Sequence, residues 1–93
     1  MAKTKLEDIL ASKTQVKLID FFLQNPRKEF YQSELKNLLN ESLGSLQYEL
    51  ARLKKIGFLI VRRTRVKTFY KINPGYFLLN DIKKLVKKIK SQK

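Results

Sequence analysis

Arginine is concentrated in one short part of this 93-residue chain: four of its five arginines lie between positions 52 and 65, whereas lysine predominates elsewhere. Arg62, Arg63 and Arg65 surround Thr64, between two runs of strand-forming residues. A guanidinium group donates two parallel hydrogen bonds to a phosphate or a carboxylate, which an ammonium group cannot do. The cluster therefore predicts a surface that contacts phosphate groups. The alternative is a solvated hairpin whose charges discourage edge-to-edge aggregation.

The net charge is unevenly distributed along the chain. Met1–Glu49 carries seven Lys and Arg against seven Asp and Glu, whereas Leu50–Lys93 carries fourteen against one. The whole formal charge of +13 therefore belongs to the second half. Such an excess attracts polyanions, of which nucleic acid is the first expectation and an anionic membrane surface the second.

Residue usage argues against catalytic and metal-binding chemistry. The chain has no Cys and no His, so it lacks the usual ligands of structural zinc, reactive thiolates and imidazole bases. Its eight acids are scattered, and no glycine-rich phosphate loop is present. We therefore expect no enzyme activity, no metal and no cofactor.

Composition and hydropathy favour a cytoplasmic protein of one domain, residues 1–93. Hydrophobic residues make up 43% and charged residues 31%, as in folded soluble proteins. The longest apolar run, Ile56–Val61, is far shorter than the roughly 18–20 residues that span a bilayer. Glu7 and Asp8 lie where a secretory signal needs an unbroken apolar stretch.

Apolar spacing predicts two helices before the middle of the chain. Leu6, Ile9 and Leu10 lie at i, i+3 and i+4, which indicates a short helix over 4–11. Ser12 is placed to cap a second helix over 13–24, which Asn25-Pro26 ends. The apolar residues of that second helix, expected in the core, are Val16, Leu18, Ile19, Phe21, Phe22 and Leu23.

A helix-turn-helix is predicted next, over 32–39 and 43–56. In the first of these helices Leu35, Leu38 and Leu39 are expected to point inward. Ser42 should cap the second by accepting from the amide of Ser45, and Gly57 should end it in the left-handed conformation. Leu43, Leu46, Leu50 and Leu53 form one stripe, expected to be buried.

Strand-forming residues follow. Phe58–Val61 and Lys67–Ile72 are expected to pair as an antiparallel hairpin within 58–72, with Glu29–Tyr31 as a minor edge strand. The tip, Thr64-Arg65-Val66, lacks Asn-Gly or Asp-Gly, so its turn type stays open. Asn80 is expected to cap a last helix over 80–91. The predicted fold is mainly α with a small β-hairpin: a winged helix-turn-helix with a three-helix core, a wing, and extra N- and C-terminal helices.

A helix that reads the major groove must bury one side and present small or hydrogen-bonding side chains near its N-terminus. The helix over 43–56 does so, although a surface helix with ordinary polar residues is the alternative. Predicted DNA contacts are Ser42, Gly44, Ser45, Gln47, Tyr48, Arg52 and Lys55 on this helix, and Arg62, Arg63, Thr64, Arg65 and Lys67 on the wing.

The last helix carries an apolar stripe among lysines, and three interpretations compete for it. The stripe could pack on its own domain, pair with a second copy, or lie on a membrane, which its narrowness and the lack of Trp disfavour. We favour a dimer. The predicted dimer residues are Leu6, Ile9, Leu10, Ile82, Leu85, Val86 and Ile89.

The sequence also resembles a known family over roughly residues 12–89. The segments that carry the likeness are Ser12–Leu18, Asn25-Pro26, Glu29–Leu35, Leu53–Gly57 and Tyr70–Pro74. They are similar to the small ArsR-type winged-helix transcription regulators of bacteria and archaea. The resemblance implies a homodimer built from the first and last helices, with Leu43–Ile56 as recognition helix and Arg62–Lys67 as wing.

Metal-sensing members of that family place cysteines in the first helix of the motif, or His and Asp in the last helix. Here Gln32–Leu39 contains no Cys and the last helix offers only Asp81, so metal sensing is not expected. The expected function is a dimeric repressor that binds double-stranded DNA sequence-specifically. The alternatives are a non-specific DNA- or RNA-binding, nucleoid-like protein and a winged helix that binds another protein.

Overall fold

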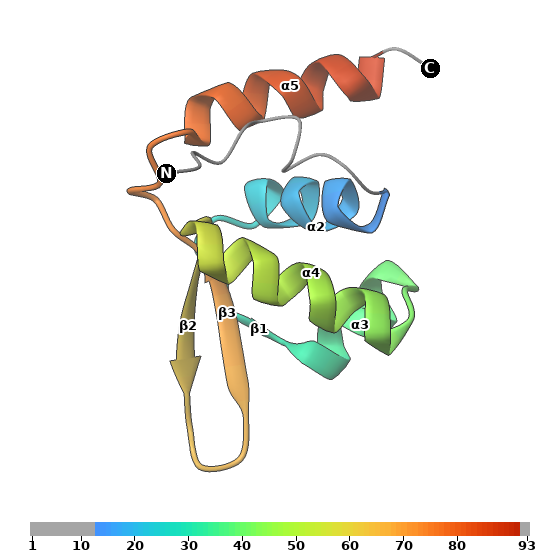
Figure 1. The fold of residues 1–93 in the computed structure, drawn as a ribbon, viewed down its shortest axis with the longest axis vertical. Coiled ribbons are helices and arrows are strands. Elements are labelled where there is room, and N and C mark those ends of the chain that lie inside the picture. Colours follow the sequence, from blue (N-terminus) through green and yellow to red (C-terminus); the bar gives the residue numbers. More distant parts are fainter. Residues whose placement is uncertain (1–12, 92–93) are drawn as a thin grey trace.

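The computed structural model describes residues 13–91 (Figure 1). The helix expected over 4–11, with Leu6, Ile9 and Leu10, and the cap expected at Ser12 lie outside the described residues. The helices are α2 (Lys13–Gln24), α3 (Gln32–Leu39), α4 (Leu43–Ile56) and α5 (Leu79–Ser91), and the strands are β1 (Phe30–Tyr31), β2 (Leu59–Arg63) and β3 (Thr68–Ile72). The predicted fold class, mainly helical with a small antiparallel sheet, is confirmed.

Helix α2 is central to the core. Its side chains Leu18, Ile19 and Phe22 are completely buried. In Figure 1 this helix runs between α5 on one side and α3 and α4 on the other. The core residues contributed by these neighbours are Leu35 from α3, Leu46, Leu50 and Leu53 from α4, and Ile82 and Val86 from α5. The DNA-reading helix predicted from the sequence is therefore attached to the core along one face only.

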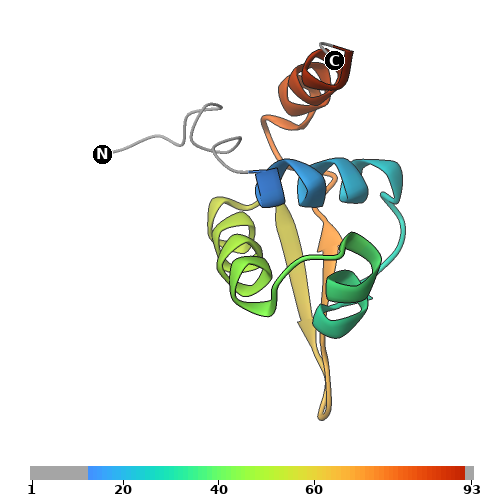
Figure 2. The same cartoon turned by 90° about the vertical axis from the view of Figure 1, so that its right-hand side faces the viewer.

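The three strands form an antiparallel sheet in the order β1-β3-β2. Strands β2 and β3 make a hairpin that projects away from the helices (Figures 1 and 2). The hairpin differs from its predicted bounds, because Phe58 lies before the strand. Its amide donates to the carbonyl of Leu53, a bond that ends α4. At the other end, Arg62 and Arg63 belong to β2 and pair with Phe69 and Thr68.

Two leucines expected in the core are exposed. Leu43 is 45% exposed and Leu38 is 58% exposed. Leu43 is the first residue of α4, one turn before the buried Leu46, so it lies beyond the part of the helix that the core covers. Leu38 lines a groove between α2 and α3, with Phe21 and Leu39. Helical periodicity overestimated how far along α4 burial extends, and in α3 it overestimated the width of the buried face, since Leu39 packs against the core beside the exposed Leu38.

The two ends of α4 have the expected caps. The Ser42 hydroxyl accepts from the amide of Ser45 at 3.3 Å, and Gly57 has φ +93°. Asn40, which ends α3, is also left-handed, with φ +53°. These caps set the direction in which α4 leaves the α3–α4 turn and the point at which the chain enters β2.

An ion pair attaches the α3–α4 turn to α2. The carboxylate of Glu41 accepts from Lys17 Nζ at 2.6 Å and from Thr14 Oγ1 at 2.7 Å. Lys17 Nζ also donates to the carbonyl of Leu39 at 3.3 Å. The hydrogen bond from Lys17 is the main cause, and that from Thr14 the second cause, of a Glu41 pKa below the usual value of 4.5.

This lowered pKa gives Glu41 a pH-dependent contribution to stability. Because the native pKa is below the unfolded one, the contribution is present above pH 4.5 and is lost as the pH falls through the native pKa. We expect Glu41→Gln to lower the free energy of unfolding by about 1 kcal/mol at neutral pH and by less in acid. Urea unfolding of both proteins over this pH range measures the difference. In the Glu41→Gln background, Lys17→Gln should add little, and independent effects of the two changes would contradict the pairing.

Candidate nucleic-acid interface

The outward side of α4 carries the polar residues predicted to meet DNA. Ser42, Gly44, Ser45, Gln47 and Lys55 are exposed. Tyr48 is 62% exposed, and the guanidinium of Arg52 lies 5.7 Å from its ring centroid. Since these two residues are one turn apart on the same helix, the contact places an aromatic face and a cation beside each other on the exposed side.

The side of α4 that faces α2 includes a polar residue that sequence reasoning did not single out. Glu49 is 4% exposed, and on α2 the side chain of Gln15 is fully buried. Both lie on the helix faces that pack in the core rather than on the predicted contact surface. A search for leucines spaced by the helical period does not identify polar residues on the buried face.

The wing tip is closed by a side chain rather than by a glycine. The amide of Thr64 donates to the carbonyl of Lys67 at 2.8 Å, and the Thr64 hydroxyl accepts from the amide of Lys67 at 3.0 Å. That hydroxyl also donates to the carbonyl of Lys67 at 3.1 Å. Arg65 and Val66 are therefore the two tip residues. Thr64, predicted to contact DNA, uses its hydroxyl to form the turn.

The neighbouring arginines of β2 have different surroundings. Successive residues of a strand point to opposite faces, so Arg63 shares the face of the buried Leu59 whereas Arg62 points to the outer face. Arg62 Nε and Nη2 donate to the two carboxylate oxygens of Glu29 at 2.9 and 2.8 Å. Among residues 13–91, Arg63 and Arg65 form no ion pair. On the wing, Arg63 and Arg65 are thus the two arginines available to contact a phosphate.

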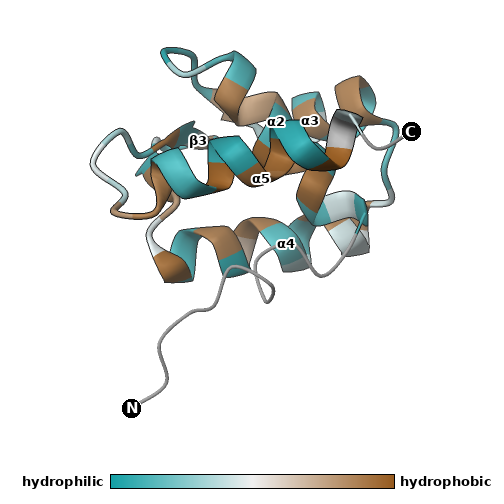
Figure 3. Cartoon of the chain, turned by 90° about the horizontal axis from the view of Figure 1, so that it is seen from above, coloured by the Kyte–Doolittle hydropathy of each residue, from teal (hydrophilic) through white to brown (hydrophobic). Residues whose placement is uncertain are grey.

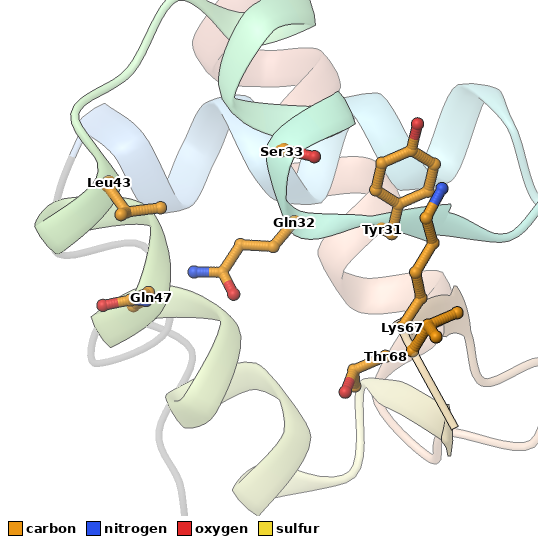
Figure 4. Close-up of a pocket in the computed structure, with 8 residues that line it drawn as sticks. Tyr31, Gln32, Ser33, Leu43, Gln47, Lys67 and Thr68 are labelled. Atoms are coloured by element: carbon orange, nitrogen blue, oxygen red, sulfur yellow. The ribbon is translucent and has the colours of Figure 1, made fainter. Parts of the chain in front are cut away.

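A cleft separates the wing from the two helices of the motif (Figure 4). Its volume is about 410 Å³, and its lining residues are Tyr31, Gln32, Ser33, Leu43, Gln47, Val66, Lys67 and Thr68. Figure 4 shows the side chain of Gln32 projecting from α3 toward Gln47 of α4, and Lys67 reaching toward Tyr31. Lys67 Nζ lies 3.7 Å from the centroid of the Tyr31 ring. Gln47 and Lys67, predicted separately, therefore line one cleft.

Tyr31, Gln32, Ser33 and Thr68 were not predicted as site residues. The first three form the junction between β1 and α3, and Thr68 begins β3. Their proximity to α4 and to the wing depends on how the hairpin folds back beside α3. The sequence signal that was available is modest: Gln32 and Ser33 begin a helix, where backbone amides are exposed.

The apolar stripe of α5 divides between the core and the surface. Ile82 is fully buried and Val86 is 3% exposed, so these two predicted dimer residues pack in their own domain, as the first interpretation had it. Leu85 is half-buried and Ile89 is 39% exposed. Seen from above, α5 alternates hydrophilic and hydrophobic residues along its length (Figure 3). Of the predicted dimer residues that lie within 13–91, only Leu85 and Ile89 retain surface for a second copy.

The start of α5 corrects a further expectation. The helix begins at Leu79, and the amide of Ile82 donates to the carbonyl of Leu78. Asn80 therefore lies in the first turn of the helix, not at its cap. Lys83, Lys84, Lys87 and Lys88 are exposed on α5, which lies at the opposite end of the molecule from the wing tip (Figure 1).

Within residues 13–91, no helix has the length and apolar character needed to cross a membrane. The same part of the chain contains no cluster of three or more His, Cys, Asp or Glu residues that could hold a metal ion.

Solved structures with the same arrangement are known. Reduced HlyU from Vibrio cholerae superposes with a TM-score of 0.66 at 20% identity, covering 92% of this chain and 82% of HlyU. The AntR antimony-specific transcriptional repressor gives 0.64 at 19% identity, covering 90% and 76%. The homodimeric winged helix-turn-helix DNA-binding domain of Mb0332 from Mycobacterium bovis, a possible ArsR-family transcriptional regulator, gives 0.62 at 15% identity, covering 98% and 87%.

No protein-family model matches the sequence, and a search of curated proteins finds no match. At these identities the three structures establish the fold. This chain has the winged helix-turn-helix fold that its resemblance to ArsR-type regulators implied.

Proposed function

We propose that this winged helix is a sequence-specific, double-stranded DNA-binding transcriptional regulator that acts as a homodimeric repressor. The observation that carries the proposal is the cleft between α4 and the wing, which Gln47 lines from the helix and Lys67 from the wing. The Mb0332 domain, which has the same fold, is described as homodimeric and DNA-binding. The proposal includes no metal sensing and no catalytic activity, and places the protein in the cytoplasm.

Helix α4 would enter the major groove by its N-terminal end. Gly44 supports this placement, because a Cβ built there would meet no atom within 4 Å. Packing within the protein therefore does not require glycine at this position, and the missing side chain would leave room for close approach to a DNA phosphate. The helix N-terminus adds exposed amides and the positive end of its dipole, both of which favour an anion.

Base recognition would fall to Gln47 and Tyr48. A glutamine side chain pairs with adenine through two hydrogen bonds, and a tyrosine ring offers an apolar surface together with a hydroxyl. Arg52, beside Tyr48, provides a third group at the same side of the helix. Arg63 and Arg65 would contact the flanking phosphates and so set the register of α4 in the groove.

A homodimer would place two copies of α4 on the DNA. The surface for it is the exposed part of α5, with Leu85 and Ile89, together with the segment that carries Leu6, Ile9 and Leu10. A two-fold dimer binds two half-sites about one helical turn apart, which gives a pseudo-palindromic operator. Binding at such a site would occlude a promoter.

In vitro selection from random duplexes tests this proposal. We expect the selected sites to converge on a pseudo-palindrome with half-sites separated by about one turn, 10–10.5 base pairs. Binding without enrichment of any sequence would instead support the nucleoid-like alternative. Failure to bind DNA even at low salt would leave the protein-binding winged helix as the remaining alternative.

Gln47→Ala and Tyr48→Ala are expected to reduce discrimination between the selected site and random DNA. If each side chain contacts a base, its loss should lower the specific binding free energy by about 1–3 kcal/mol more than the non-specific one. Competition binding with both duplexes at one salt concentration measures the difference. Lys55→Ala is the matched control on the same helix and should weaken both duplexes alike. Equal losses for Gln47→Ala on both duplexes would assign it to positioning.

A further inference from the structure

A row of paired side chains crosses the outer face of the sheet. The register places Phe69 of the central strand opposite both Arg62 of β2 and Tyr31 of β1. The guanidinium of Arg62 lies 4.6 Å from the ring centroid of Phe69, and the Phe69 and Tyr31 rings meet edge to face at 6.0 Å. Glu29, just before β1, completes the row by pairing with Arg62 across the central strand. Arg62 is therefore held in a defined position.

The partner of Arg62 has the geometry of a phosphate contact. Both oxygens of the Glu29 carboxylate accept from the same guanidinium, at 2.8 and 2.9 Å. A DNA phosphate accepts from arginine through two oxygens in the same way. The carboxylate thus occupies the pair of donors on Nε and Nη2, and a phosphate that binds Arg62 through this pair must displace Glu29.

The pair is also accessible to a competing anion. The side chains of Arg62 and Glu29 are 54% and 33% exposed. An ion pair in contact with water is weak and is readily exchanged. The hydrogen bond from Arg62, together with the nearby charge of Lys71, lowers the pKa of Glu29, so this carboxylate is ionised at neutral pH.

We propose that Glu29 competes with a DNA phosphate for Arg62 and thereby weakens the sequence-independent part of DNA binding. The inference rests on the proposed function. Non-specific binding consists almost entirely of phosphate contacts, so withholding one guanidinium lowers it directly. At the operator the base contacts of α4 add to the phosphate contacts, so withholding one phosphate contact leaves base recognition a larger share of the binding free energy.

Salt titration of binding to a random-sequence duplex tests the role of Glu29. Glu29→Gln removes the competing charge and keeps the side-chain size, so Arg62 becomes available for one more phosphate. The log–log dependence of affinity on salt should steepen by about 0.9. If the two proteins bind equally at about 1 M salt, the variant should bind roughly 8-fold more tightly than the wild type at about 0.1 M salt. In the Arg62→Ala background, Glu29→Gln should leave the slope unchanged.

The controls separate this proposal from simpler effects. Asp81→Asn removes an exposed acid from α5, away from the wing, and should not change the slope. An unchanged slope for Glu29→Gln overturns the proposal. So does an equal steepening in the Arg62→Ala background, which would show that only a negative charge had been removed. A wild-type protein that fails to bind any duplex at low salt would instead reject the proposed function itself.

Discussion

Replacing Arg63 and Arg65 together by alanine should weaken binding to the selected site and to random duplex by nearly the same factor. Both residues are exposed, both belong to the wing, and among residues 13–91 neither forms an ion pair. Each lost phosphate contact is expected to flatten the log–log salt dependence by about 0.9, so two lost contacts flatten it by about 1.8. If the variant and the wild type bind equally at about 1 M salt, the variant should bind roughly 60-fold more weakly at about 0.1 M salt.

The fifth arginine provides the matched control for the wing variant. Arg27 is exposed but precedes the sheet, outside the wing. Arg27→Ala should therefore leave the salt dependence nearly unchanged. A double variant at positions 63 and 65 that binds with the wild-type slope would remove the wing tip from the interface. A loss confined to the selected site would show that these arginines read bases or groove width rather than phosphates.

Leu50→Ala is expected to have the largest effect on stability. Leu50 is 1% exposed and belongs to the α4 face that packs in the core with α2. Removing its side chain loses buried apolar surface and leaves a cavity, which together cost about 2–5 kcal/mol of unfolding free energy. A small domain has only about 5–15 kcal/mol in total, so part of the population should unfold on mild heating.

Leu43→Ala is the matched control, because it makes the same chemical change on the same helix at a residue that is 45% exposed. Its unfolding free energy should differ from wild type by about 0.5 kcal/mol or less, as for most surface substitutions. Urea unfolding monitored by circular dichroism measures both variants. Equal destabilisation by the two changes would show that Leu43 is buried in solution, as helical periodicity had suggested.

Local patterns in the sequence were sufficient for the helices. Spacing of leucines identified the buried face of α4, and Ser42 and Gly57 marked its ends through backbone requirements that depend on neighbouring residues only. The same logic failed at Leu43 and Leu38, because periodicity gives neither the length nor the width of the helix face that neighbouring elements cover. Tyr76 was also missed: it follows the break at Asn73-Pro74-Gly75, yet it is 6% exposed and packs edge to face with Phe58.

Contacts between distant segments could not be read from the chain. Arg62 and Glu29 are 33 residues apart, and their pairing requires β1 to join the sheet beside β3. The predicted list therefore treated Arg62, Arg63 and Arg65 as equivalent, whereas strand alternation and this ion pair make Arg62 different. The cleft that joins Gln47 to Lys67 depends on the same tertiary arrangement.

The backbone conformation of the wing turn does not depend on which side chains occupy its tip. Thr64 closes the turn through its own side chain, and among residues 13–91 only Asn40 and Gly57 have positive φ. Arg65 and Val66 therefore meet no requirement for glycine or asparagine, and many side chains fit there without strain. During divergence from a common ancestor, these two positions can change independently of the fold. Substitutions at the tip could therefore change how strongly the wing binds phosphates while the scaffold stays constant.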